Sequence, residues 1–159
     1  MKAYLANGLF SASERFFNEE LAKQLRESIP ELELYVPQEN PAINDKQAFA
    51  TSEEIAAADL QALRVSDFLI AVIDGVEIDS GVAAEIGVYS TFDRPIIGVY
   101  TDVRQQGVHH PKKIAILQAD PTENQFVYRN LFVVGLIKQN GIIVDSIEAA
   151  VEAALEIKK

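Results

Sequence analysis

The sequence has no cysteine at any of its 159 positions. Disulfides, thiolate zinc sites, redox pairs and cysteine nucleophiles are therefore excluded together. Basic residues are also scarce: 14 lysines and arginines stand against 24 acidic residues, for a net charge of −10. Proteins that bind nucleic acids or anionic membranes present Lys and Arg to phosphates, so this balance argues against both kinds of partner.

Long apolar runs are missing too. No run approaches the roughly 20 residues that a membrane-spanning helix needs. The first residues, which reach Asn7-Gly8 after one short apolar stretch, do not have the pattern of a signal peptide. We therefore expect a cytoplasmic protein. Its hydrophobic content of 48% and its length fit one globular domain over residues 1–159.

Strand-like and helix-like patterns alternate along the chain. Strands are predicted at residues 2–6, 32–36, 68–73, 95–100 and 142–144. Helices are predicted at residues 11–29, 80–92, 124–139 and 146–157, with another that opens at Thr51. Residues 37–50 read as a long loop, and residues 101–120 follow no clear pattern.

This alternation predicts an α/β fold with a five-stranded parallel sheet that is flavodoxin-like and doubly wound, in the order 2-1-3-4-5. Ligands of such folds bind outside the carboxyl ends of the strands, near the switch in strand order. The segments expected at that edge are residues 7–13, 37–50, 74–85 and 101–110.

One segment at this edge stands out, from Asp79 to Gly87. Gly81 and Gly87 are poor helix residues, which indicates that something packs closely against the backbone. Glu85 lies one turn after Gly81 on the same helix face, near a helix N-terminus that favours a charged carboxylate. These are the requirements of a carboxylate nucleophile. The alternative is that Glu85 faces solvent and Asp79 only caps the helix.

Asp59 is a second acidic candidate, alone in an apolar-rich helical stretch. Paired carboxylates on one cleft are typical of glycosyl transfer, where one attacks the anomeric carbon and the other handles the proton of the leaving group. An ordinary exposed aspartate is the alternative interpretation.

Other motifs are weaker or absent. His109 and His110 are adjacent, so their side chains diverge, and no further metal ligands can be placed beside them. The sequence contains no GxGxxG, GxxxxGK[ST] or GxSxG motif. Asp74 suits an aspartyl-phosphate receiver domain, but the end of the first strand provides no acidic partner. Ser80 fits a cap or a ligand contact better than a nucleophile.

Taken in order, four segments of the chain resemble the nucleoside 2-deoxyribosyltransferase family. They are Tyr4-Leu5-Ala6-Asn7-Gly8-Leu9-Phe10, Tyr35-Val36-Pro37, Asp59-Leu60 and the D-x-G-x-x-x-E-x-G element from Asp79 to Gly87. A weaker match to the family pattern, Asn130-Leu131 with Gly135 and Asn140, extends toward the C-terminus.

The resemblance implies a role for each matched residue. Glu85 corresponds to the nucleophile that attacks C1′ of deoxyribose, and Tyr4 to the hydroxyl that orients it. Asp79 corresponds to the group that holds a sugar hydroxyl, and Asp59 to the acid near the base. The remaining expected substrate-binding residues are Asn7, Gly8, Phe10, Gly81 and Asn140, the last reaching into a neighbouring subunit's site. The family also implies a homo-oligomer, no metal or organic cofactor, and a part in nucleotide salvage.

Two positions differ from the family pattern. The base-contacting glutamine expected after the second strand is replaced by Pro41, although Gln38 and Glu39 lie near, and no aromatic residue ends the chain. Base specificity therefore stays open. So does a relative that hydrolyses deoxynucleoside 5′-monophosphates, whose phosphate would sit on Ser11, Ser13 and Arg15 at a helix N-terminus. A non-catalytic nucleotide-binding module is a third possibility on this fold.

Overall fold

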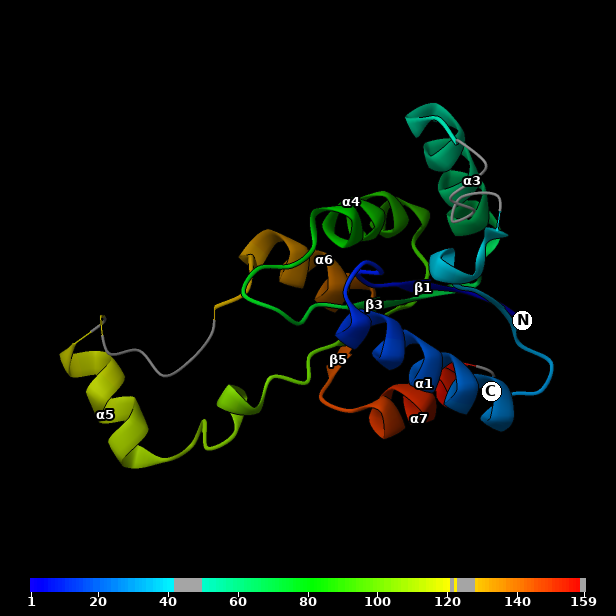
Figure 1. The fold of residues 1–159 in the computed structure, drawn as a ribbon. Helices are drawn as coiled ribbons and strands as arrows, with labels where there is room; N and C mark the ends of the chain where they lie inside the picture. The colour runs from blue at the N-terminus through cyan, green and yellow to red at the C-terminus, as the bar shows by residue number, and fades with distance from the viewer. Residues whose placement is uncertain (42–49, 121, 123–127, 158–159) are drawn as a thin grey trace.

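A parallel sheet of five strands forms the centre of the molecule (Figure 1). The computed structural model describes residues 1–41, 50–120, 122 and 128–157. The strand order is β2-β1-β3-β4-β5, which confirms the predicted fold and order. The strands are β1 (Lys2–Ala6), β2 (Glu33–Tyr35), β3 (Phe68–Val72), β4 (Ile96–Val99) and β5 (Gly141–Val144).

Helices cover both faces of the sheet. On one face α1 (Ala12–Ser28) and α7 (Ile147–Ile157) pack on Ala3 and Leu5 of β1. On the other, α3 (Ser52–Val65), α4 (Ser80–Tyr89) and α6 (Leu131–Asn140) pack around Tyr4 and Ala6. Successive strand residues point to opposite faces, so the apolar run of a central strand supplies two cores. β3 is buried throughout for this reason.

Capping residues set the helix starts. Ser11 with Glu14, and Thr51 with Glu54, form the two predicted capping boxes. Asn130 caps α6 by accepting hydrogen bonds from the next helical turn, so this helix begins at residue 131, not at 124 as predicted. Residues 124–127 of that prediction lie outside the described residues.

The helix predicted for residues 80–92 ends earlier, since α4 gives way at Ser90 to a short 3-10 helix, η2 (Ser90–Phe92). The predicted loop after the second strand begins with another short helix, η1 (Pro37–Glu39), and its residues 42–49 lie outside the described part. No loop separates α6 from β5, which starts at Gly141 instead of 142.

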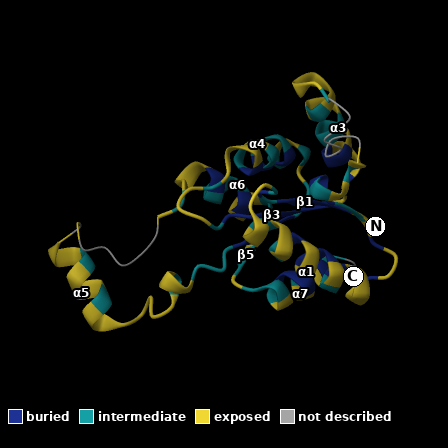
Figure 2. Cartoon of the chain, in the orientation of Figure 1, coloured by how far each residue is buried: buried dark blue, intermediate teal, exposed yellow. Residues whose placement is uncertain are grey.

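The unassigned stretch from 101 to 120 contains a short 3-10 helix, η3 (Val103–Gln105), and a helix, α5 (Pro111–Ala119). Pro111 suits the first turn of a helix because its missing N–H would have no partner there. α5 stands away from the layered body in Figure 1, and Figure 2 shows no buried residue on it. Among the described helices, none is both long and apolar enough to cross a membrane.

Candidate active site

Glu85 on α4 and Tyr4 on β1 meet between that helix and the sheet. Tyr4 lies on β1 and points to the face that α4 covers, and its hydroxyl donates a 2.5 Å hydrogen bond to Oε1 of Glu85. Tyr4 is fully buried, and Glu85 is only partly accessible. The predicted helical face of Glu85 therefore turns inward to the sheet instead of out to solvent.

A second tyrosine and a second carboxylate lie beside this pair. The hydroxyl of Tyr35, at the end of β2, donates to Oδ1 of Asp59 on α3 at 3.1 Å. The rings of Tyr4 and Tyr35 stack with centroids 5.2 Å apart. Asn40 donates to the hydroxyl of Tyr35 at 3.0 Å. The two predicted carboxylates thus belong to one cluster, joined through two stacked tyrosines.

Burial dominates the electrostatics of this cluster. Removal from water raises the pKa of Glu85 to about 7, and repulsion from Asp59 and Asp79 adds to the effect, while the Tyr4 hydrogen bond opposes it. Burial likewise raises the pKa of Asp59, against hydrogen bonds from Tyr35 and Tyr4. The pKa of Tyr4 is raised by burial and by the nearby Glu85 charge, so its hydroxyl stays protonated and can donate.

Asp79 lies at the N-terminus of α4 and borders a cleft of about 440 Å³. Its Oδ1 accepts hydrogen bonds from the backbone N–H groups of Gly81 at 2.8 Å and Val82 at 3.1 Å. Asp79 can cap α4 and also contact a ligand, because both capping bonds go to Oδ1 and leave its other carboxylate oxygen out of the cap. The cleft is lined by Asn7, Gly8, Ser11, Ser13, Glu14, Phe17, Val72, Asp74, Gly75, Glu77 and Asp79.

Asn7 and Gly8 are held by a residue that the sequence did not single out. Asn18 on α1 is only 2% exposed. Its amide accepts from Asn7 at 2.8 Å and donates to the Gly8 carbonyl and to Gln38, both at 3.0 Å. Asn18 precedes the buried Leu21 by one helical turn, so a polar residue on the apolar face was the available signal.

Phe10 and Asn140 are expected site residues that do not line the cleft. The side chain of Phe10 is 85% exposed. Asn140 ends α6 next to Gly141, which pairs with Ile96 at the amino ends of the strands, opposite the cleft. Its expected reach into a neighbouring subunit stays a prediction, as does the substrate contact of Phe10.

The two glycines of the Asp79 segment differ. A β carbon on Gly81 would meet the Asp79 carboxylate at 3.0 Å, so this glycine leaves room for the cap. A β carbon on Gly87 would meet no described atom within 4 Å. The described residues therefore give no packing reason for Gly87, and the expectation of close packing there stays a prediction.

The two polar residues near Pro41 are engaged away from the carboxylates. Gln38 binds Asn18, and Glu39 forms an ion pair with Arg26 at 2.7 Å. Asn40, by contrast, donates to the hydroxyl of Tyr35, which in turn donates to Asp59.

The N-terminus of α1 already holds an anionic group of the chain itself. The Glu14 carboxylate accepts from the backbone N–H groups of Phe10 at 3.2 Å and Ser11 at 2.8 Å, and from the Ser11 hydroxyl at 2.7 Å. These bonds lower the pKa of Glu14. Arg15 is exposed and does not line the cleft. Ser11 and Ser13 line the cleft, and the expected phosphate position there stays a prediction.

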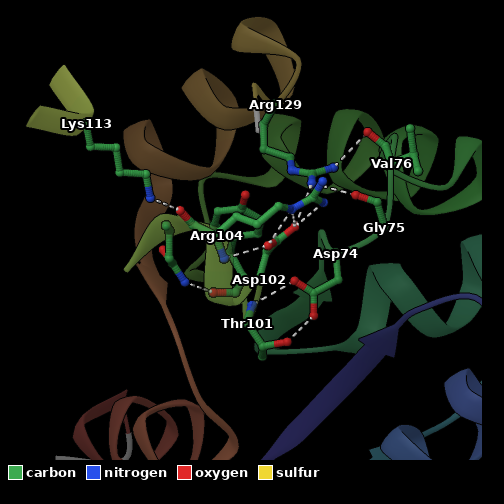
Figure 3. Close-up of polar contacts among 10 residues, drawn as sticks. Asp74, Gly75, Val76, Thr101, Asp102, Arg104, Lys113 and Arg129 are labelled. Carbon is green, nitrogen blue, oxygen red and sulfur yellow. Dashed lines mark hydrogen bonds and ion pairs between the residues drawn. The ribbon is translucent and has the colours of Figure 1, made fainter. Parts of the chain in front are cut away.

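The loop between β3 and α4 is tied down by polar contacts, shown in Figure 3. The Asp74 carboxylate accepts from the backbone N–H of Thr101 at 2.7 Å and from its hydroxyl at 2.5 Å. Arg129 donates to the carbonyls of Gly75 at 2.5 Å and Val76 at 3.3 Å. Sequence reasoning missed Arg129, and no local pattern distinguishes it from a surface arginine.

Asp102 completes this network. It pairs with Arg104 and lies 3.8 Å from Arg129, whose guanidinium stacks over the Tyr100 ring. These contacts lower the pKa of Asp102 to about 2, with the Arg104 hydrogen bonds as the largest cause. Through its bonds with Thr101, the Asp74 carboxylate is used to hold the loop between β3 and α4. In the part of the chain that the structure describes, no three potential metal ligands gather at one point.

Comparisons with known proteins identify the family and support the fold. The family model "Nucleoside 2-deoxyribosyltransferase" matches residues 3–148. A crystal structure of a conserved protein from Enterococcus faecalis V583 is 46% identical, with a TM-score of 0.90 over 99% of this chain and 97% of that one. No match was found among curated proteins.

Two more distant structures share the fold. A 2-deoxyribosyltransferase from Bacillus psychrosaccharolyticus has a TM-score of 0.64 at 17% identity, over 94% of this chain and 90% of the other. A CMP N-glycosidase from Clostridium botulinum has a TM-score of 0.50 at 17% identity, over the whole of both chains. With the family model spanning nearly its full length, the chain belongs to the nucleoside 2-deoxyribosyltransferase family.

Proposed function

We propose that the protein transfers 2-deoxyribose between nucleobases by double displacement. Glu85 attacks C1′ of a 2′-deoxynucleoside, the bond from C1′ to the base nitrogen breaks, and its electron pair leaves with the base. Asp59 gives the departing base a proton. A nitrogen of the acceptor base then attacks C1′, the ester bond to Glu85 breaks, and Asp59 takes up the proton that the acceptor loses.

The observation that carries this proposal is the 2.5 Å hydrogen bond from Tyr4 to Glu85 inside the cluster that contains Asp59. A carboxylate nucleophile must be fixed in place and partly freed from water before it can compete with the leaving base. Burial raises the pKa of Asp59, a direction that favours the proton-carrying form that this role needs. Asp79, with one carboxylate oxygen left by its cap, is proposed to hold a sugar hydroxyl.

The charge of the cleft favours substrates without a 5′-phosphate. Glu14, Asp74, Glu77 and Asp79 contribute four carboxylates to its lining, and none of the described residues that line it is a lysine or arginine. A phosphate placed there would meet like charges, and the N–H groups of Phe10 and Ser11 just before α1 are already bonded to Glu14. This supports deoxynucleosides over deoxynucleoside 5′-monophosphates. We further propose that the active form is a homo-oligomer.

The test is base exchange between a deoxynucleoside and a free base, followed chromatographically with the wild type, Glu85→Ala and the control Glu53→Ala. Glu53 is an exposed residue of α3. The proposal expects exchange by the wild type and the control only. Equal exchange by Glu85→Ala would contradict it.

The products separate the alternatives. Free deoxyribose formed in excess acceptor base would identify a hydrolase. Cleavage restricted to 5′-monophosphates would overturn the preference inferred from the cleft. Binding of nucleosides without turnover under any acceptor condition would identify a non-catalytic module.

A further inference from the structure

Tyr35 and Asn40 lie in the catalytic cluster but have no part in the reaction as proposed above. Tyr35 ends β2, and Asn40 directly follows η1. The Tyr35 hydroxyl donates to Oδ1 of Asp59 at 3.1 Å and accepts a hydrogen bond from Asn40 at 3.0 Å. Two hydrogen bonds in series thus connect the loop after β2 to the acid that serves the base in the proposed function.

Asn40 sets the direction of the Tyr35 hydroxyl. A phenolic hydroxyl has one proton to donate and lone pairs that accept, whereas an amide nitrogen only donates. Nδ2 of Asn40 therefore occupies a lone pair of the Tyr35 oxygen and leaves the Tyr35 proton to be given to Asp59. The same oxygen would be free to turn its proton elsewhere if position 40 offered an acceptor.

The backbone on both sides of Asn40 is restrained. Glu39 accepts two hydrogen bonds from Arg26 on α1, at 2.9 and 2.7 Å. Pro41 follows Asn40, and a proline disfavours helical backbone in the residue before it. Asn40 has an extended backbone, with φ −76° and ψ 106°. The proline found in place of the expected glutamine thus helps to keep Asn40 beside Tyr35.

Each of the two stacked tyrosines is bonded to a different carboxylate. The single proton of Tyr4 lies in its 2.5 Å hydrogen bond to Glu85. Tyr35, whose ring centroid is 5.2 Å from that of Tyr4, donates to Asp59. Tyr35 can therefore orient the acid without competing for the hydrogen bond that orients the nucleophile.

We propose that Tyr35, directed by Asn40, is a positioning residue that holds Oδ1 of Asp59 and leaves Oδ2 to exchange the proton with the base. This inference rests on the proposed function. As Glu85 bonds to C1′, the bond from C1′ to the base nitrogen breaks, its electron pair stays with the base, and the proton on Oδ2 passes to the base. In the second displacement Oδ2 takes up the proton that the acceptor base loses.

The fixed bond to Oδ1 matters because proton transfer depends on direction. A carboxyl group that rotates points its proton at the base for only part of the time, and the rate of proton transfer falls accordingly. Loss of the Tyr35 hydroxyl should therefore slow the departure of bases that need a proton. It should have little effect on bases that leave without one.

The test compares these two kinds of base. The base of N7-methyl-2′-deoxyguanosine already carries a positive charge, and 5-nitro-2′-deoxyuridine releases a stabilised anion, so both depend little on an acid. Their matched partners are 2′-deoxyguanosine and 2′-deoxyuridine. Release of the base is followed in a single turnover with enzyme in excess, which isolates the first displacement.

Tyr35→Phe keeps the ring beside Tyr4 and removes the hydroxyl. We expect base release to slow by about tenfold or more with the ordinary nucleosides, and by less than about twofold with their activated derivatives. Tyr89→Phe is the control, because it removes a buried hydroxyl that bonds the Ser66 carbonyl at 3.0 Å, outside the cluster. Its effect should be the same on both kinds of substrate. A loss in Tyr35→Phe that is equal for both kinds, or no loss, would overturn the proposal.

Two changes at Asn40 test the direction of the hydroxyl. Asn40→Asp offers an acceptor that draws the Tyr35 proton away from Asp59, so it should reproduce the selective loss of Tyr35→Phe. Asn40→Leu removes the donor without adding an acceptor, and its loss should be smaller. Wild-type rates in Asn40→Asp with the ordinary nucleosides would overturn the proposal.

Failure of the proposed function itself would look different. A wild type that releases no base from any of these substrates, or Glu85→Ala that releases them at the wild-type rate, would contradict the proposed function and this inference with it. An equal loss for both kinds of substrate in Tyr35→Phe would contradict this inference alone.

Discussion

Tyr4 and Glu85 are 81 positions apart in sequence and are joined by a 2.5 Å hydrogen bond. Tyr4 belongs to the second residue pair of the β1–β3 ladder, and Glu85 lies on the helix that follows β3. The distance between them is therefore set by the packing of α4 on the sheet. A nucleophile held in this way depends on the core as much as on its immediate neighbours.

Tyr4→Phe tests the orienting role of the hydroxyl. The ring that fills the core is kept, so the fold should be retained. We expect kcat to fall about 10²-fold, because the carboxylate loses its fixed direction. The hydrogen bond lowers the pKa of Glu85, so the acid limb of the pH–rate profile should also move upward. Tyr128→Phe, at an exposed tyrosine, is the control.

The pH dependence of the wild type follows from the burial of Glu85. Only the ionised carboxylate can attack C1′, and its pKa is raised to about 7. The rate of base exchange should therefore rise with pH through about 7. A rate that stays constant from about pH 5 to 8, the range on either side of this value, would contradict the assignment.

Glu85→Gln should stabilise the protein at high pH while it abolishes transfer. The pKa of this carboxyl rises from an ordinary value of 4.5 to about 7 on folding, so the native state binds the extra proton. Wild-type stability then falls as the pH rises through this window, and the glutamine variant avoids that loss. Thermal unfolding should give similar Tm values at about pH 4.5 and a Tm a few degrees higher for the variant at about pH 8. A lower Tm for the variant at the higher pH would contradict the burial effect.

Arg129→Met tests the tie on the β3–α4 loop. Removing the guanidinium leaves the carbonyls of Gly75 and Val76 without their donor, and the wall that presents Glu77 and Asp79 should loosen. We expect KM for the deoxynucleoside to rise about tenfold, a loss of about 1.4 kcal/mol, with a smaller effect on kcat.

Arg104→Met is the matched control for that change. Arg104 pairs with the same Asp102 but makes no hydrogen bond to the loop among the described contacts. Its kinetics should stay near those of the wild type. Equal losses in the two variants would mean that the charge balance at Asp102 matters, and not the tie to the loop.

Asn18→Ala should destabilise the fold. The buried amide bonds Asn7, Gly8 and Gln38, and its removal leaves these groups unpaired. We expect the free energy of unfolding to drop by about 1–3 kcal/mol, measured by urea denaturation. Lys23→Ala, at an exposed position of the same helix, should change it by less than about 0.5 kcal/mol.

Regular patterns predicted the fold well. The two-sided apolar run of β3, the capping boxes at Ser11 and Thr51 and the alternation of strands with helices indicated the sheet and its order. The start of α6 was misplaced because the apolar residues before Asn130 imitate a helical period, whereas the cap is decided by one side chain. α5 lacked a signal because its helix has no buried face in the chain.

The family pattern pointed to Tyr4, Asp59, Asp79 and Glu85. The structure joins Tyr4, Asp59 and Glu85 in one cluster, and the roles of all four residues stay predictions. Tyr35 belongs to a matched segment but was given no role, and Arg129 was missed, because their contacts join strand ends and loops far apart in sequence. The position of Glu14 in the lining of the cleft was not predicted either. A capping box predicts its bond to Ser11, but not that its carboxylate also faces the cleft.

The position of Asn18 has a practical consequence for altering base preference. One amide fixes the turn after β1 and the first residues after β2, so the two segments are mechanically coupled. In a library that varies residues 38–40 alone, most new loop shapes would lose the contact with Asn18. Such variants would be lost to poor folding before their base preference could be measured. Varying position 18 together with that loop would let the two adapt as a unit.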